Sequence, residues 1–105
     1  MKDDRSVDAV FFALSDPTRR AVIRRLSERR VTATELSAEI PVSRQAIAKH
    51  LAVLEEAGLV EPERSGREVR FRLTPRPLGE AASWIDDVGA EWDRRLGALR
   101  RHLRG

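Results

Sequence analysis

The side chains best suited to binding chemistry lie at the start of one predicted helix near the middle of the chain. Arg44, Gln45, Ala48 and Lys49 share the polar face of this segment. Arginine can bond O6 and N7 of guanine together, and glutamine can bond N6 and N7 of adenine in the same way. Alanine offers a methyl group to the methyl of thymine, and lysine suits a phosphate or a guanine. These residues predict a helix that contacts base edges in the major groove of DNA.

Both ends of this helix are marked in the sequence. Ser43 is a favourable N-cap, because its hydroxyl can accept from backbone N–H groups of the first turn. Gly58 stands where a left-handed residue after the helix is expected, and Leu59 can fold back on Leu54 as in a Schellman motif. Taken alone, the segment also fits an ordinary amphipathic helix with a polar outer face. The apolar residues three and four positions apart that predict its buried face are Ile47, Leu51 and Leu54.

Three shorter helices are predicted before it. The first begins at Ser6. The second has Asp16 as N-cap and Pro17 at its first position, and it runs to about Arg29. The third begins with a capping box at Thr32. Pro41 ends the third helix and leaves only a tight turn, so the third and fourth helices form a helix-turn-helix. The second helix is expected to bury Val22, Ile23 and Leu26 and to expose Arg19, Arg20, Arg24 and Arg25.

The sequence after Gly58 alternates polar and apolar residues, which indicates strands. Residues 68–73 alternate strictly, residues 59–64 form a weaker strand with Pro62 marking an edge, and Ser65-Gly66 makes the turn. A hairpin placed directly after a recognition helix is a wing, and basic wing tips commonly contact the phosphate backbone. A plain solvated hairpin is the alternative. The expected wing contacts are Arg64, Gly66 and Arg67, with Arg70 and Arg72 on the outward face.

A long final helix follows Pro77. Its apolar residues keep a helical spacing over about 26 residues, or roughly 39 Å, which a domain of this size does not cover by itself. We therefore expect the first and last helices to pair with their symmetry mates in a homodimer; packing within one chain is the alternative. The expected interface residues are Val7, Val10, Phe11, Leu14, Trp84, Val88, Trp92, Leu96 and Leu99.

Composition limits the classes of protein that the chain can belong to. Its 105 residues predict a single domain, residues 1–105, and 20 basic against 17 acidic residues give a net charge of +3. Most basic residues are arginines, which suit bidentate phosphate recognition, although a genome rich in G and C is an alternative source. Without cysteine there is neither a disulfide nor a thiolate metal site. No apolar run approaches a membrane span and no signal-peptide core is present, so we expect a cytoplasmic, nucleoid-associated protein.

Residues 14–20 and 42–60 resemble the start of the second helix and the recognition helix of the ArsR/SmtB family of dimeric winged-helix repressors from bacteria. The resemblance covers nearly the whole chain. It implies a major-groove position for Arg44, Gln45, Ala48 and Lys49, a phosphate contact for Ser43, and a wing tip at Gly66 and Arg67.

The chain departs from the metal-sensing members of that family. Many of them bind metal through cysteines or through Asp, His and Glu sets on the last helix. Here Asp86 and Asp87 lack a histidine three or four residues away, and His102 is followed by no acid. Because a zinc site needs three or four well-spaced ligands, we expect no metal and no cofactor.

The predicted fold is mainly α with a small β-hairpin (α+β), a winged helix-turn-helix that dimerises through its first and last helices. The predicted function is that of a sequence-specific DNA-binding regulator, a repressor that binds a pseudo-palindromic operator as a homodimer. The alternative is a winged-helix module that binds a protein without specific DNA binding. An enzyme is not expected, because two histidines and no cysteine supply no catalytic constellation. No motif in the sequence identifies an operator, a regulated gene or an effector.

Overall fold

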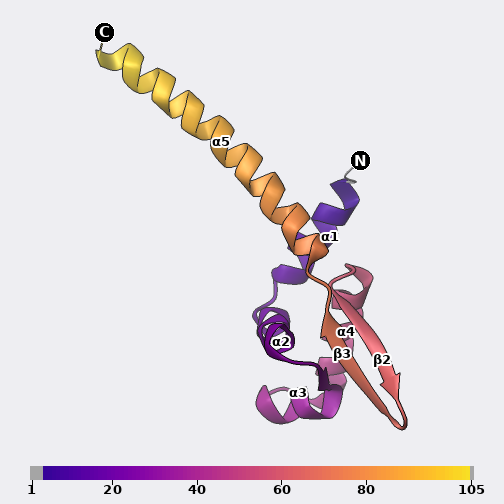
Figure 1. Cartoon of the computed structure of the whole chain (residues 1–105). Helices are drawn as coiled ribbons and strands as arrows, with labels where there is room; N and C mark the ends of the chain where they lie inside the picture. The colour runs from indigo at the N-terminus through magenta and orange to yellow at the C-terminus, as the bar shows by residue number, and fades with distance from the viewer. Residues whose placement is uncertain (1–3, 105) are drawn as a thin grey trace.

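The computed structural model describes residues 4–104, and side chains from Ser6 to Arg104. The chain forms helices and strands in the predicted order, with one additional strand (Figure 1). The elements are α1 (Asp4–Leu14), α2 (Pro17–Glu28), β1 (Val31–Thr32), α3 (Ala33–Glu39), α4 (Arg44–Glu56), β2 (Val60–Ser65), β3 (Glu68–Leu73) and α5 (Arg76–Arg104). No helix in this range is long and apolar enough to cross a membrane.

Side-chain caps set the boundaries of the central helices. The Asp16 carboxylate accepts from the backbone N–H groups of Thr18 and Arg19 and starts α2, with Pro17 at its first position. Thr32 and Glu35 form the capping box of α3. Each side chain accepts from a backbone N–H group that the helix itself leaves without a partner. These predicted starts are confirmed, whereas the start at Ser6 was wrong, because α1 already runs through that residue from Asp4.

The end of α4 is the predicted Schellman motif. Gly58 has φ of +75°, in the left-handed region. The N–H of Gly58 donates to the carbonyl of Glu55 at 2.9 Å, and the N–H of Leu59 donates to the carbonyl of Leu54 at 3.0 Å. A residue with a Cβ atom is disfavoured at such a φ, so glycine is the natural residue where the chain turns from α4 into the wing.

The wing belongs to a three-stranded antiparallel sheet in the order β1-β3-β2. β1 was not predicted; it pairs Val31 with Phe71 and attaches the wing to the start of α3. β2 lies at the edge, as Pro62 indicated. The predicted turn was wrong by one residue, because Ser65 pairs with Glu68 and the turn is formed by Gly66 and Arg67.

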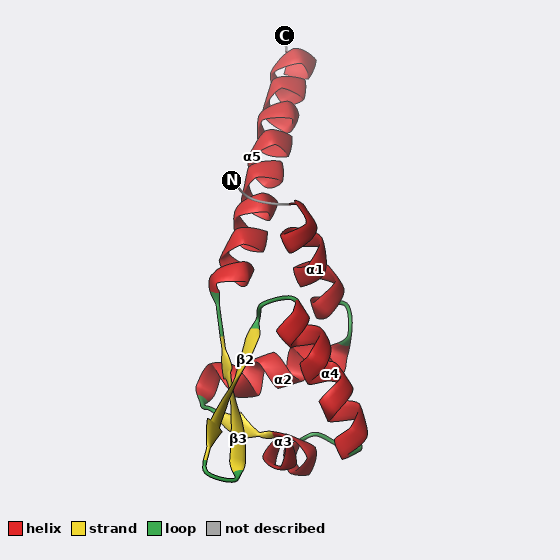
Figure 2. Cartoon of the chain, turned by 90° about the vertical axis from the view of Figure 1, so that its right-hand side faces the viewer, coloured by secondary structure: helices red, strands yellow, loops and turns green. Residues whose placement is uncertain are grey.

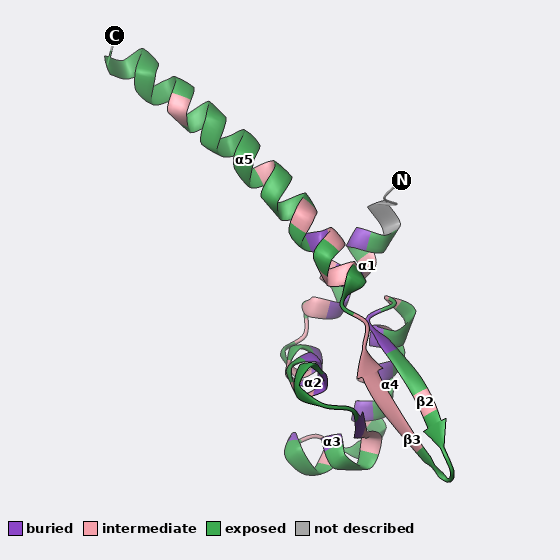
Figure 3. Ribbon diagram, in the orientation of Figure 1, coloured by how far each residue is buried: buried purple, intermediate pink, exposed green. Residues whose placement is uncertain are grey.

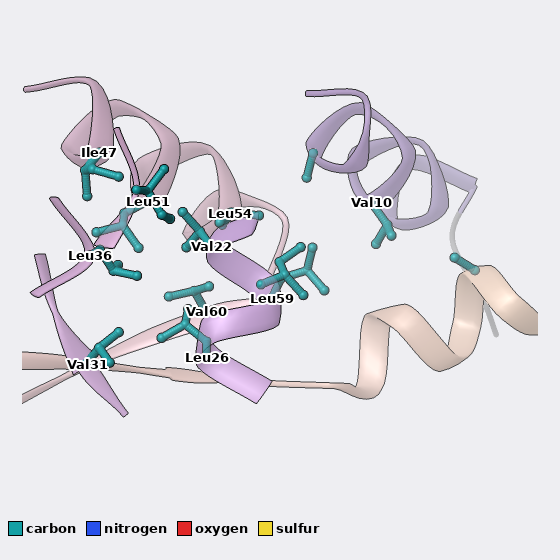
Figure 4. Packing of buried hydrophobic residues seen from close by; sticks show 14 residues of the cluster. Val10, Val22, Leu26, Val31, Leu36, Ile47, Leu51, Leu54, Leu59 and Val60 are labelled. Atoms are coloured by element: carbon teal, nitrogen blue, oxygen red, sulfur yellow. The ribbon is translucent and has the colours of Figure 1, made fainter. Parts of the chain in front are cut away.

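The core fills the space between α2, α3, α4 and the sheet (Figure 4). The predicted buried faces of α2 and α4 are both present, and Leu36 of α3 and Val31 of β1 are fully buried between them. Val10 of α1 is also fully buried, and Val7 is 5% exposed. These two valines, which we expected at an interface between chains, are thus already covered within one chain.

Helix α5 extends away from this body (Figures 1 and 2). It has 29 residues and gives the molecule a longest dimension of 69 Å against 32 and 21 Å. Its N-terminal part packs against α1, and Ala81 is its one buried residue. Beyond that contact the helix is exposed along nearly its whole length (Figure 3).

Candidate nucleic-acid interface

The predicted base-contacting side chains share the exposed surface at the N-terminal end of α4. Arg44, Gln45, Ala48 and Lys49 are all exposed, while Ile47 on the opposite face is fully buried. The helix is therefore held to the core by its apolar face and presents the four residues outward together.

Ser43 fixes the start of this surface. Its hydroxyl oxygen accepts from the backbone N–H of Ala46 at 3.1 Å, as expected of an N-cap. The side chain is exposed, so the hydroxyl hydrogen can still point to a group outside the chain. A phosphate oxygen placed there would also meet the positive end of the α4 dipole.

Two arginines of the wing are exposed to solvent. Arg64 and Arg67 are exposed beside the turn, and neither makes an ion pair with another residue between 4 and 104. Gly66 has φ of +62°, and a Cβ built there would meet no atom within 4 Å. The conformation of the turn, rather than lack of space, is what favours glycine.

A groove joins the recognition helix α4 to the wing. Its volume is about 630 Å³, and Arg44 and Arg67 both line it, together with Phe71 at the base of β3. The wing turn and α3 lie at the same end of the molecule, opposite α5 (Figure 2). Glu35 and Glu68 also line the groove and pair with Arg70, so the arginines that it offers to a strand of nucleic acid are Arg44 and Arg67.

The two arginines on the outward face of the wing form ion pairs with acidic residues of the same chain. Arg70 pairs with Glu35 at 3.2 Å and with Glu68 at 3.1 Å. Arg72 pairs with Glu63 at 3.2 Å and also with Glu61. Arg70 and Arg72 therefore add little net positive charge to the wing, because each has two carboxylates beside it.

These geometries can be compared with known proteins. A helix-turn-helix domain family matches residues 14–63. The HTH-type transcriptional regulator Rv2034 of Mycobacterium tuberculosis is 38% identical over 96 residues, which cover 91% of this chain and 87% of that protein. The arsenical resistance operon repressor of Escherichia coli is 32% identical over 95 residues, covering 90% and 81%. The structure of an ArsR-like transcriptional regulator from Rhodococcus sp. RHA1 is 44% identical, covers 92% of each chain and has a TM-score of 0.83.

The chain belongs to the ArsR family. It is a DNA-binding transcriptional regulator with the winged helix-turn-helix fold, as the sequence predicted. The alternative of a protein-binding module without specific DNA binding is not favoured, because the similar proteins are transcriptional regulators.

One arginine of α2 in this ArsR-family regulator lies inside the protein rather than on the DNA-facing surface. Arg19, which we expected to be exposed, is 8% exposed. Its Nε donates to the carbonyl of Ala13 at 2.8 Å and its Nη2 donates to the carbonyl of Phe12 at 2.9 Å. Both carbonyls lie in the last turn of α1, where helical partners run out; that of Phe12 also accepts from the backbone N–H and the hydroxyl of Ser15. Helical spacing could have revealed this, because position 19 lies three and four residues before the buried Val22 and Ile23.

The other arginines of α2, and Arg29 directly after it, divide into those with and those without an ion pair. Arg25 and Arg29 both pair with Glu39 of α3, at 3.4 and 2.6 Å. Arg20 and Arg24 are exposed and make no ion pair with another side chain of residues 6–104. Only part of the predicted basic surface of α2 is therefore available to a polyanion.

The expected dimerisation residues of the ArsR-family chain fall into two groups. On α1, Phe11 and Leu14 are half-buried against the core, and the Phe11 ring packs edge-on against Trp84 with centroids 5.7 Å apart. On α5, Val88 is half-buried, whereas Trp84, Trp92, Leu96 and Leu99 are between 43% and 54% exposed. The apolar surface open to a partner lies mainly on α5.

The described residues contain no group of three or more His, Asp or Glu side chains that could hold a metal ion. Asp86, Asp87 and His102 are exposed on α5. The ArsR-family fold is thus present here without a ligand cluster in the described part of the chain.

Proposed function

We propose that this regulator represses transcription by binding a pseudo-palindromic operator as a homodimer, with residues 1–105 acting as one domain. The observation that carries the proposal is the shared groove, which Arg44 from the recognition helix and Arg67 from the wing both line; neither makes an ion pair with another side chain of residues 6–104. The similar repressor of arsenical resistance in Escherichia coli supports repression as the outcome of binding.

The side chains divide by the part of DNA that each can contact. We assign base contacts in the major groove to Arg44, Gln45, Ala48 and Lys49, because they are exposed on the first two turns of α4. We assign phosphate contacts to Ser43 at the helix N-terminus, and to Arg64, Gly66 and Arg67 in the wing. The first set would select a sequence, and the second would hold the protein on any duplex.

A homodimer places two such surfaces on one duplex. The exposed apolar face of α5 supports this part of the proposal, because large apolar side chains such as Trp92 and Leu99 gain from being covered. Two recognition helices about 34 Å apart would enter successive major grooves on one side of B-form DNA. We infer no catalytic activity, and the site of action is the nucleoid, where bacterial DNA lies.

A gel-shift titration at two salt concentrations tests the proposal. The probes are the DNA upstream of the protein's own coding region and a random duplex of equal length. The specific probe should be retarded at lower protein concentration, and affinity for both should fall steeply as salt rises, because binding releases counterions from phosphates. Footprinting of the retarded complex should show protection with two-fold symmetry. Failure to retard either duplex at low salt would contradict the proposal and favour a protein partner.

A further inference from the structure

One polar contact joins a side chain of the recognition helix α4 to the helices behind it. Nη1 of Arg19 in α2 lies 3.5 Å from Nδ1 of His50 in α4. Among residues 6–104, no other side chain of α4 makes a hydrogen bond or an ion pair with a different helix or strand. The remaining side-chain contacts that hold α4 come from its apolar residues, which have no directional preference of their own.

The apolar packing is incomplete on the flank of α4 that carries this contact. His50, Val53 and Ala57 follow one another at helical spacing, and all three are half-buried. Val53 and Ala57 border a hollow of about 270 Å³, which α1 lines on its other side with Ala9 and Phe12. A helix beside a hollow has room to turn, whereas close-packed neighbours would prevent it. The directional bond at His50 is therefore the contact on this flank that can fix the rotation of α4.

The guanidinium group of Arg19 is itself held in one orientation. Arg19 is buried, and its Nε and Nη2 donate to the carbonyls of Ala13 and Phe12 at 2.8 and 2.9 Å. Because the group is planar and its N–H donors point in fixed directions, these two bonds determine where Nη1 points. That third nitrogen faces His50, so the end of α1 and the ring on α4 are held by the same rigid group.

The contact also selects one form of the His50 ring. A guanidinium group has five donors and no acceptor, so Nδ1 of His50 must accept in this hydrogen bond and carries no hydrogen. The hydrogen of the neutral ring then lies on Nε2.

We propose that Arg19 is a positioning residue for DNA recognition, which acts through His50 to fix the rotation of α4 about its axis; this inference rests on the base contacts of the proposed function. Side-chain atoms lie about 5–6 Å from the axis of a helix, so a rotation of about 10° moves them by about 1 Å. The bidentate base contacts assigned to Arg44 and Gln45 do not tolerate such a shift. Attraction to phosphates is sequence-independent and depends on charge, so it is little affected by the same rotation.

Two variants of nearly equal shape separate the hydrogen bond from the packing at position 50. His50→Asn keeps an acceptor, because Oδ1 of asparagine is as many bonds from the backbone as Nδ1 of histidine. His50→Leu has the same branched shape and no acceptor. Leucine favours a helix more than asparagine does, so a purely structural role makes His50→Leu the better variant, and the proposal makes it the worse one.

Fluorescence anisotropy with two duplexes measures the effect. The probes are the DNA upstream of the protein's own coding region and a random duplex of equal length. His50→Leu should lose about tenfold of the wild-type preference for the upstream DNA, or roughly 1.4 kcal/mol, and bind the random duplex as the wild type does. His50→Asn should keep most of that preference. Glu55→Asn and Glu55→Leu, at an exposed position of α4, form the control pair and should not differ from each other in preference.

The outcomes separate this inference from the proposed function. If the wild type prefers the upstream DNA and His50→Leu does so equally, or if both His50 variants lose the preference to the same extent, the positioning role is overturned and the proposed function stands. A wild-type chain with no preference between the duplexes would overturn both.

Nitrogen NMR of the imidazole rings gives a second test that needs no DNA. The chain has two histidines, so the signals of His50 are those that disappear in His50→Asn. We expect the neutral ring of His50 to carry its hydrogen on Nε2 and to have Nδ1 in the shift range of a hydrogen-bond acceptor. A hydrogen on Nδ1 would show that Arg19 does not donate to this ring, and it would overturn the positioning role whatever the DNA titrations gave.

Discussion

Nη1 of Arg19 lies 3.5 Å from Nδ1 of His50, so a buried residue of α2 contacts the recognition helix. The same guanidinium group holds the last carbonyls of α1 and lies over the Phe12 ring, 5.2 Å from its centroid. Three helices therefore meet at one side chain. Arg19 links α1, which packs against α5, to α4, which carries the residues proposed to contact bases.

Replacing Arg19 by methionine should destabilise the fold by about 2–4 kcal/mol. Methionine fills much of the space but donates no hydrogen bond, so the carbonyl of Ala13 loses the donor Nε of Arg19, and the carbonyl of Phe12 keeps only the two donors of Ser15. Urea unfolding followed by circular dichroism would measure the change. The matched control is Arg20→Met, because Arg20 is exposed and donates to the carbonyl of Leu14 at the surface. It should cost less than about 1 kcal/mol, and equal losses for both variants would contradict a special role for Arg19.

The contrast between Arg19 and the helix caps shows what could be predicted from the sequence. The starts of α2, α3 and α4 depend on residues within four positions of one another, so Asp16, Thr32 and Ser43 could be identified as caps. The division of α4 into a buried and an exposed face followed from the same local periodicity. The contacts of Arg19 depend on where α1 ends and how α4 packs, and no short stretch of sequence contains that information.

Strand β1 and the ion pairs of the wing also depend on residues far apart in the sequence, so a short stretch of sequence does not predict them. β1 has only two residues, too few for a periodic pattern, and it exists because Val31 and Thr32 pair with distant Phe71 and Arg70. Arg70 was placed only on the outward face of the wing, because its partner Glu35 lies thirty-five residues away in the sequence. Long-range pairing of this kind is fixed by packing of the whole domain, so the sequence alone does not show which arginines of the wing are paired.

The cap at Asp16 makes stability depend on pH in the acid range. Hydrogen bonds from the backbone N–H of Arg19, together with that of Thr18, lower the pKa of Asp16, even though desolvation opposes the shift. Because the pKa of the folded state lies below that of the unfolded state, the ionised cap contributes its full stabilisation above the unfolded pKa of about 4. That contribution is lost as the pH falls through the folded pKa.

Asp16→Asn should therefore flatten the acid limb of the stability profile, because asparagine still caps the helix but does not ionise in this range. Urea midpoints at several pH values between 2 and 7 would measure the profile. Glu28→Gln, which removes an exposed acid near the other end of α2, is the control and should retain the wild-type slope. An unchanged slope in Asp16→Asn would show that other groups govern the acid transition.

Three arginine substitutions should separate base recognition from general attraction to DNA. Arg44→Ala should lose about 1–3 kcal/mol of discrimination between the operator and a scrambled duplex, because a bidentate base contact is removed. Arg67→Ala should weaken binding to both duplexes by similar factors and lower the salt dependence by about one counterion. Fluorescence anisotropy with both duplexes at several salt concentrations gives these quantities.

Arg72→Ala is the matched control within the wing. Since Glu61 and Glu63 already neutralise this side chain, its loss should affect DNA affinity less than the loss of Arg67. An equal effect of both substitutions would show that the ion pairs open when DNA binds. If Arg44→Ala weakened both duplexes alike, its role would be a phosphate contact within the groove that it shares with Arg67.

Residues 77–93 of α5 contain five acids and no base, whereas residues 94–104 contain five arginines and no acid. Exchanging charges between this acidic half and this basic half should weaken and then restore self-association of the chain. Asp86→Arg with Asp87→Arg places positive charge opposite the partner's basic half, and this variant should dissociate about tenfold more readily, or by roughly 1.4 kcal/mol. Adding Arg100→Asp and Arg101→Asp to the same chain exchanges both halves. In an antiparallel pair the fully exchanged chain should again associate with itself, while pairing poorly with the wild-type chain. Sedimentation of each variant and native mass spectrometry of the mixture measure both effects.

Glu55→Arg with Glu56→Arg makes the same change in net charge on α4 and should leave association unchanged. Preferential pairing of the exchanged chain with wild type is the result that a parallel arrangement requires, because only then does each exchanged half face the opposite sign.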